Sequence, residues 1–479
     1  MSVRQIAQAP PELVDTSTDR NLFRHEAIKL SILYLICWAT VYFETPLPVR
    51  FGVTLLLVFI QLSSYYYASI IMLMAIFIPF FNIFFDNAIS GVTITRLLFA
   101  LFFILSLNKK KLRELQIDSK LLVLAMIALV TLQLSSSYQI LFKNMPISGD
   151  GSAAGYINVL AIIYDNVVIV LFLYFAYTRL PFAKLNHLVN FVILLAILEA
   201  ASLLFVAVQN ADQVFGSAAS DLNRNILWLN PMFGHKNDWS MILVFIFLLV
   251  IVRNIYVKEY KVLYYLTLGV VLPAIAISLS RQAYVWCVLV FLVVSWLQKD
   301  FRFVGYLSVI VLLVVLFQPD FILQRIQSML EVRNVEDFQE LNRKVSDLAI
   351  DQAVGNFTIV PRMFFQNWEY NWSEGFWNGF LHQQGIIGLL YTVFLYFFIY
   401  RRYSALSKIK KGGLYHYCII LMTAIVLMFL ANFNRRYTHF MHYKGDIGQI
   451  GFLVMFLIFY AELIYSAIRR KLANLELLK

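Results

Sequence analysis

A short polar segment at residues 230–241, NPMFGHKNDWSM, carries two side chains that can bind an anion. His235 and Lys236 stand just before a predicted helix. The first backbone N–H groups of a helix have no partner within it, and they favour phosphate oxygens. The simpler interpretation is a polar helix start without a ligand. The segment therefore indicates a phosphate contact only in combination with other cations.

A second cation lies in the segment SLSRQAYVW at residues 278–286. The chain turns at Ser280–Arg281 between two apolar runs with almost no loop, so Arg281 is expected at the rim of a helix bundle. Its guanidinium group is a rigid fork of donors that matches phosphate and keeps its charge. The alternative is an interfacial anchor beside Tyr284 and Trp286, because aromatic side chains gather at the same membrane depth.

Glu374 lies in the segment SEGFWNGFLHQQGIIGLLY at residues 373–391. Its residue type and its surroundings suit a general base. A tryptophan-rich setting that partly excludes water suits a carboxylate to accept a proton from a hydroxyl group. The alternative is an acid that complements a helix dipole. Asn378 and His382 in the same segment are candidate substrate contacts. Arg435 and Arg436, in NFNRRYTHFMHYKGD, can add donors to the same site or cap the bundle.

The elements that must position these residues are membrane helices. Hydrophobic residues make up 61% of the 479 residues and charged residues only 14%, which excludes an ordinary soluble domain. The net charge of +11 lies in runs that flank apolar segments, so membrane topology explains it better than nucleic acid does. Cys37, Cys287 and Cys418 sit in apolar runs without ligand spacing, which argues against disulfides and a zinc site.

The sequence predicts an all-α polytopic membrane protein with about fourteen transmembrane helices. The polar N-terminus lacks the apolar core of a signal peptide and is expected to be cytoplasmic. With that orientation every strong basic cluster lies inside, and the C-terminus is cytoplasmic too. The expected organisation is a cytoplasmic tail at 1–26, helices 1–11 at 27–318, an outer loop at 319–377, helices 12–14 at 378–466 and a cytoplasmic tail at 467–479.

The longest connection between the expected helices is a polar outer loop, and further outer loops lie at 209–236 and 433–446. Their ranges are roughly 28–45, 50–64, 66–84, 92–107, 120–141, 156–178, 187–209, 237–256, 262–280, 282–298, 302–318, 378–400, 413–432 and 447–466. The loop at 319–377 holds Arg343 and Arg362 among many acids, and it is where a polar substrate would be handled.

Three ionisable residues lie inside the expected helices: Arg96, Asp165 and Glu199. Such residues must face the bundle interior or a wet cavity, because lipid cannot solvate their charge. They could form a proton or ion relay. The alternative is structural pairing near helix ends.

The chain resembles the O-antigen ligase and polysaccharide polymerase superfamily of bacterial inner membranes. The resemblance rests on four features that follow in this order on one membrane face: the GHKN segment, the SRQAYVW turn, the large outer loop and the re-entry ending in GIIG. The resemblance spans roughly residues 225–400, and its motifs are short. It implies a GT-C-like glycosyltransferase fold whose periplasmic loop is mostly helical. It also implies an undecaprenyl-pyrophosphate-linked oligosaccharide as donor, with no metal and no other cofactor.

Within that superfamily, ligases carry a histidine where the loop re-enters the membrane, and this chain has Glu374 there. The resemblance therefore leans towards a Wzy-type polymerase that joins lipid-linked repeat units. Arg281 would bind the pyrophosphate, with support from Lys236, His235, Arg435 or Arg436, and Glu374 would accept the proton of the acceptor hydroxyl. Fixed arginines must neutralise the leaving group if no metal does so. Arg343, Arg362, Asn378 and His382 would contact substrate.

Two alternatives stay open. A ligase would transfer the glycan to lipid A–core instead, using His382, His235 or the acid itself. A transporter or flippase, a different class of protein, is suggested by the three ionisable residues within the helices. Membrane lipids are expected partners, a chain-length regulator protein is a further candidate, and nucleic acid is not expected.

Overall fold

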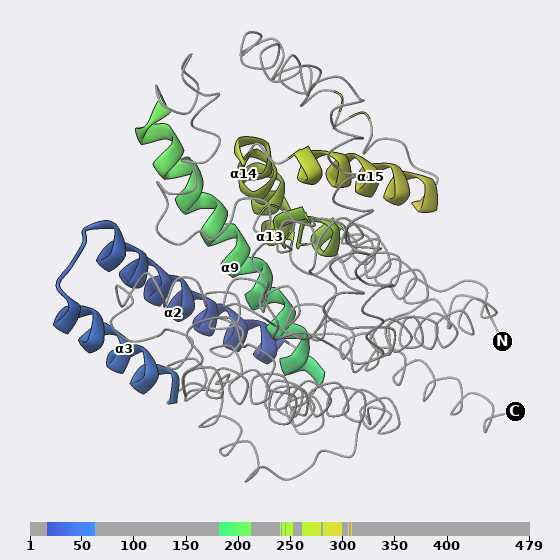
Figure 1. The fold of residues 1–479 in the computed structure, drawn as a ribbon. Helices are drawn as coiled ribbons and strands as arrows, with labels where there is room; N and C mark the ends of the chain where they lie inside the picture. Colours follow the sequence, from blue (N-terminus) through green and yellow to red (C-terminus); the bar gives the residue numbers. More distant parts are fainter. Residues whose placement is uncertain are drawn as a thin grey trace, which may run out of the picture.

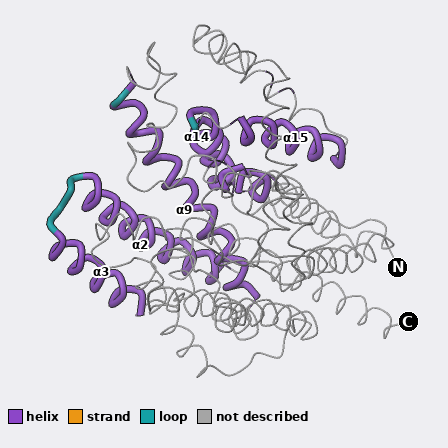
Figure 2. The backbone as a smooth tube through the Cα atoms, in the orientation of Figure 1, coloured by secondary structure: helices purple, strands orange, loops and turns teal. Residues whose placement is uncertain are grey.

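The computed structural model describes residues 17–62, 182–211, 261–278 and 281–298, with residues 240–251 except 241 and 245, and the single residues 305 and 308. The described residues form helices and the turns that join them, with no strand among them (Figures 1 and 2). The prediction of an all-α protein is confirmed for this part of the chain.

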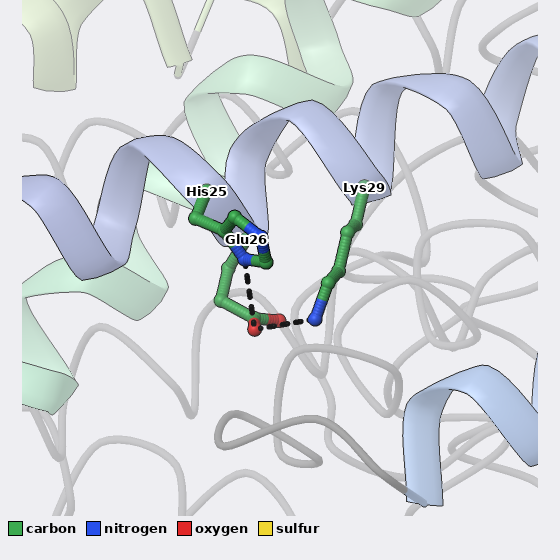
Figure 3. A network of polar contacts seen from close by, with 3 residues as sticks. All are labelled: His25, Glu26 and Lys29. Atoms are coloured by element: carbon green, nitrogen blue, oxygen red, sulfur yellow. Dashed lines mark hydrogen bonds and ion pairs between the residues drawn. The ribbon is translucent and has the colours of Figure 1, made fainter.

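Helix α2 spans Ser17–Tyr42 and begins well before the apolar run expected at 28–45. Its first part was expected to belong to the polar tail. Figure 3 shows side chains that favour the longer helix: Lys29 donates to Glu26 at 3.1 Å, one turn away, and His25 Nδ1 lies 4.0 Å from the same carboxylate. Pairs of this spacing stabilise a helix by a few tenths of a kcal/mol, ~0.2–0.5. The helix therefore extends beyond its apolar part.

A tight turn joins α2 to helix α3, which spans Leu47–Leu62 and runs back alongside α2 (Figure 1). The carbonyl of Thr40 accepts hydrogen bonds from the backbone N–H and the hydroxyl of Thr45, at 3.0 and 2.9 Å. Glu44 takes a left-handed conformation with φ 48°, as residues that end helices often do. Arg50 is 5% exposed, and its Nε donates to the Thr45 carbonyl at 2.8 Å.

Helix α9 spans Phe182–Gln209. Its part Val189–Gln209 is 21 residues long, has a mean hydropathy of 2.7, and is long and apolar enough to cross a membrane. At a rise of about 1.5 Å per residue this part matches a hydrocarbon core of about 30 Å. Within the described residues it alone meets both criteria of length and composition, and most of it is buried by neighbouring helices.

Helices α2 and α9 pack against each other and run in the same direction (Figure 1). Four contacts join them in order from start to end: Phe23 with Phe191, Tyr34 with Ser202, Trp38 with Phe205, and Tyr42 with Gln209. Tyr34 and Ser202 are 168 residues apart in the sequence, and Tyr42 and Gln209 are 167 apart, so the offset between the two helices changes by only one residue along their contact. We call the end that holds Tyr42 and Gln209 the turn end, and the opposite end the start end.

A third group of helices packs on α9. Helix α13 (Lys261–Leu266) continues through the π-helix η2 (Thr267–Val271) into α14 (Leu272–Ile277), and all three contact α9. In Figure 1 the path from α13 to α14 runs in the same sense as α9, so α14 lies nearer the turn end. Helix α15 (Arg281–Gln298) then runs back, and Phe291 packs on Phe247 of the apolar helix Ile242–Ile251, with ring centroids 5.2 Å apart.

Candidate functional site

Arg281 is the first residue of α15, and three residues separate it from Ile277, the last residue of α14. The turn is held on both sides. Ser278 donates its hydroxyl to the Ile275 carbonyl at 2.7 Å, and the hydroxyl of Tyr284 reaches back from α15 to the Ala276 carbonyl. These bonds fix the backbone of α15 against α14, and the first backbone N–H groups of α15 have no carbonyl within their own helix. Arg281 is therefore a cation at the N-terminus of a helix, a position that favours anions such as phosphate.

The other residues proposed for catalysis and substrate binding lie outside the described residues. They are Glu374, His235, Lys236, Arg435, Arg436, Arg343, Arg362, Asn378 and His382. Of the sequence-predicted site, the structure describes the backbone position of Arg281 alone. Arg96 and Asp165 also lie outside the described residues.

Glu199 is the one member of the ionisable trio that the structure describes, and it lies in the apolar part of α9. It is 0% exposed and equally far from both ends of Val189–Gln209. Neither carboxyl oxygen has a hydrogen-bond partner. The side chain therefore lies far from either end of its helix, unlike the end-of-helix pairing considered above.

The polar group facing Glu199 is the hydroxyl of Tyr34 on α2. The two groups interact electrostatically, although they do not meet hydrogen-bond geometry. The Tyr34 hydroxyl lies 3.0 Å from Ser202 Oγ, one turn after Glu199 on α9. Ser202 Oγ also donates to the Glu199 carbonyl at 2.8 Å. Glu199, Tyr34 and Ser202, which we call the central cluster, thus form a polar contact between two largely apolar helix faces, in addition to the Tyr42–Gln209 hydrogen bond at the turn end.

Sequence reasoning found Glu199 but missed its neighbours. A tyrosine and a serine inside apolar segments carry no signal on their own, because both residues occur throughout such helices. A search for polar residues spaced three apart on one helix would have paired Glu199 with Ser202. Tyr34 could not be found that way, since its role depends on the packing of segments far apart in the chain.

The described part of the chain contains no group of three or more histidine, cysteine, aspartate or glutamate side chains that could hold a metal ion. Comparisons with protein families, with curated proteins and with solved structures found no match.

Proposed function

We propose that the chain is a multi-pass polymerase of the bacterial inner membrane, which joins undecaprenyl-pyrophosphate-linked oligosaccharides at the periplasmic face. The observation that carries the proposal is the turn between α14 and α15. It holds Arg281 at the first position of a helix, with its backbone tied to the preceding helix through Tyr284. A cation at the start of a helix suits a diphosphate leaving group, whose charge grows as the glycosidic bond breaks.

The parallel register of α2 and α9 supports the multi-pass arrangement. These helices contain the first and the seventh of the fourteen expected crossings. Two crossings whose numbers differ by an even number traverse the membrane in the same direction. The first and the seventh differ by six, and α2 and α9 do run in the same direction. A topology with one expected crossing lost or gained between them would require the two helices to run in opposite directions.

The positions of charge and of exposed apolar residues support a membrane as the surroundings. Basic residues of α2 and α9 lie in their N-terminal halves, so the parallel packing gathers them at the start end. This is the end expected to face the cytoplasm. Between the start end and the turn end, the exposed side chains of α2 include Ile28, Ile32 and Leu35, each about half exposed. A soluble bundle would place polar residues on such a face.

In the proposed reaction, Arg281 binds the pyrophosphate of the growing chain, with Lys236, His235, Arg435 or Arg436 adding positive charge. Glu374 accepts the proton of the acceptor hydroxyl on the incoming repeat unit. The hydroxyl oxygen forms the new bond to the anomeric carbon while the bond to pyrophosphate breaks, which inverts that centre. Arg343, Arg362, Asn378 and His382 hold the sugars.

The test uses the purified full-length protein and a lipid-linked repeat unit. Chain growth should occur with the wild type. Arg281→Ala should lower its rate by about 10²–10³-fold, the usual effect of removing one charge-stabilising donor. Arg281→Lys should restore it only in part, because lysine lacks the bidentate fork. Arg302→Ala, at a position expected on the cytoplasmic side, is the matched control and should leave the rate unchanged.

Unaltered growth in Arg281→Ala would remove that residue from the mechanism. Glu374→Gln tests the base independently, since it keeps the size of the side chain but cannot accept the proton. Absence of chain growth by the wild type, together with transfer of the glycan to added lipid A–core, would identify the ligase instead.

One observation favours a transporter as a second candidate function. Glu199 lies at the centre of a membrane-length helix and has no ionic partner among the described residues, as expected for a coupling site. Collapse of the membrane potential should stop transport but should leave the polymerase reaction unchanged, because polymerisation moves no charge across the membrane.

A further inference from the structure

The hydrogen-bond directions within the central cluster follow from the number of hydrogens available. A serine hydroxyl has one hydrogen to donate. Ser202 uses it for the Glu199 carbonyl, at 2.8 Å. Either hydroxyl could donate in the 3.0 Å contact between Tyr34 and Ser202. With the Ser202 hydrogen on the Glu199 carbonyl, Tyr34 donates and Ser202 Oγ accepts. The Tyr34 hydroxyl oxygen is left to face the Glu199 carboxyl group with its lone pairs.

That arrangement fits a neutral acid better than a carboxylate. A neutral carboxyl group can donate its hydrogen towards the Tyr34 oxygen, whereas a carboxylate can only accept. An ionised carboxyl group that is 0% exposed, with neither oxygen hydrogen-bonded, would also lose its hydration without compensation. Both arguments place a hydrogen on Glu199 when the cluster is packed as described.

We propose that Glu199 is a proton-binding site and that its proton acts as a latch between α2 and α9. With the proton bound, Tyr34 donates to Ser202 and the two helices are joined. When the proton leaves to water, the carboxylate attracts the Tyr34 hydrogen, and the bond to Ser202 is lost. No other covalent bond changes. This inference rests on the central cluster and does not depend on the proposed polymerase activity.

Few other groups can compete for this role. On α2, Tyr34 faces the carboxyl group and Cys37 lies next to Tyr34. Among the described residues that pack on α9, η2 and α14 have no titratable side chain, and α13 has Lys261, which is exposed at its start, with Tyr264 and Tyr265. A metal ion is a weaker occupant, because hard cations take about six or more oxygen ligands and the cluster supplies fewer.

Infrared spectra of the full-length protein in lipid test the proposal directly. A neutral carboxylic acid and a carboxylate absorb at different frequencies, so the wild type minus Glu199→Gln difference isolates this one group. We expect the neutral-acid band at low pH and its replacement by carboxylate bands as the pH rises. Tyr34→Phe removes the acceptor and should shift the neutral band, whereas Ser31→Ala, on the same helix, should not.

Spin labels at Leu35 on α2 and Val208 on α9, both exposed, report whether the latch opens. The distance between them should change over the same pH range as the infrared band in the wild type. It should stay constant in Glu199→Gln, which cannot ionise. A carboxylate at every pH, a neutral acid at every pH, or bands that respond to sodium or potassium rather than to pH would each overturn the proposal.

Discussion

The hydroxyl of Tyr34 lies 3.0 Å from Ser202 Oγ, and this contact joins two helices whose partners are 168 residues apart. It lies midway along a helix pair that is also held by aromatic rings, such as Phe23 on Phe191 with centroids 5.0 Å apart, and by the Tyr42–Gln209 hydrogen bond at the turn end. The rings supply contact area, and the hydroxyl pair fixes which turn of α2 meets which turn of α9. Sliding either helix by one turn would leave two buried hydroxyls without each other.

A double-mutant cycle with Tyr34→Phe and Ser202→Ala should measure that contact. Each single change should lower the free energy of unfolding by about 1 kcal/mol, because it leaves a buried polar partner behind. The double variant should lose less than the sum, with a coupling of about 0.6 kcal/mol, typical of hydrogen bonds between membrane helices. Unfolding in mixed detergent micelles gives these values. Ser31→Ala is the control, because the Ser31 hydroxyl donates to the Ala27 carbonyl of its own helix. Losses in unfolding free energy that add strictly in the double variant would contradict the prediction.

Cysteine cross-linking should report the parallel register of α2 and α9. In a chain whose three native cysteines are replaced, Tyr42→Cys with Gln209→Cys should be bridged efficiently by a short bismaleimide, because these side chains touch at the turn end. Tyr42→Cys with Phe191→Cys should not be bridged, since Phe191 contacts Phe23 at the start end. A reversed preference would mean that the helices run antiparallel, and the count of crossings between them would then be odd.

Within the part of the chain that the structure describes, the helices were largely predictable, and their contacts were not. Apolar runs gave the expected ranges 187–209 and 282–298, and the structure has Phe182–Gln209 and Arg281–Gln298. The start of α2 at Ser17 was not predicted, because residues 17–26 are mostly polar and carry no apolar period, which is the signal that marks the expected crossings. The π-helix at Thr267–Val271 was missed as well, since its residue types are those of an ordinary apolar helix. Glu199 was recognised by its charge, whereas Tyr34 needed the tertiary fold.

The π-helix should tolerate a side chain at its glycine. Gly269 has a negative or extended φ, and a Cβ added there would meet nothing within 4 Å. Gly269→Ala should therefore raise the free energy of unfolding by up to about 1 kcal/mol, because alanine loses less backbone freedom on folding. Gly269→Pro is the contrasting change and should destabilise by about 3 kcal/mol or more. Destabilisation by alanine would show that the π-turn needs the glycine backbone.

Spin labels should distinguish a lipid-facing surface from a water-facing one. Leu35 is 53% exposed and lies near the middle of the expected crossing 28–45, whereas Glu44 is exposed in the turn that follows α2. In lipid vesicles a label at Leu35 should collide with oxygen and be shielded from a water-soluble nickel complex, because the proposed membrane surrounds that part of α2. A label at Glu44 should show the opposite preference. Equal access of the nickel complex to both positions would place α2 in water.

Removing the ring of Phe291 should lower the free energy of unfolding far more than removing the side chain of Leu292. Phe291 is 2% exposed and packs on the fully buried Phe247, so Phe291→Ala leaves a cavity and loses that contact. The expected loss in unfolding free energy is about 3–5 kcal/mol. Leu292 is next in the chain but 46% exposed, so Leu292→Ala should cost well under half as much. Both free energies come from unfolding in mixed micelles. Similar losses for the two variants would mean that α15 is rotated about its axis. Such a rotation would also turn Arg281, the first residue of the helix, away from its described position.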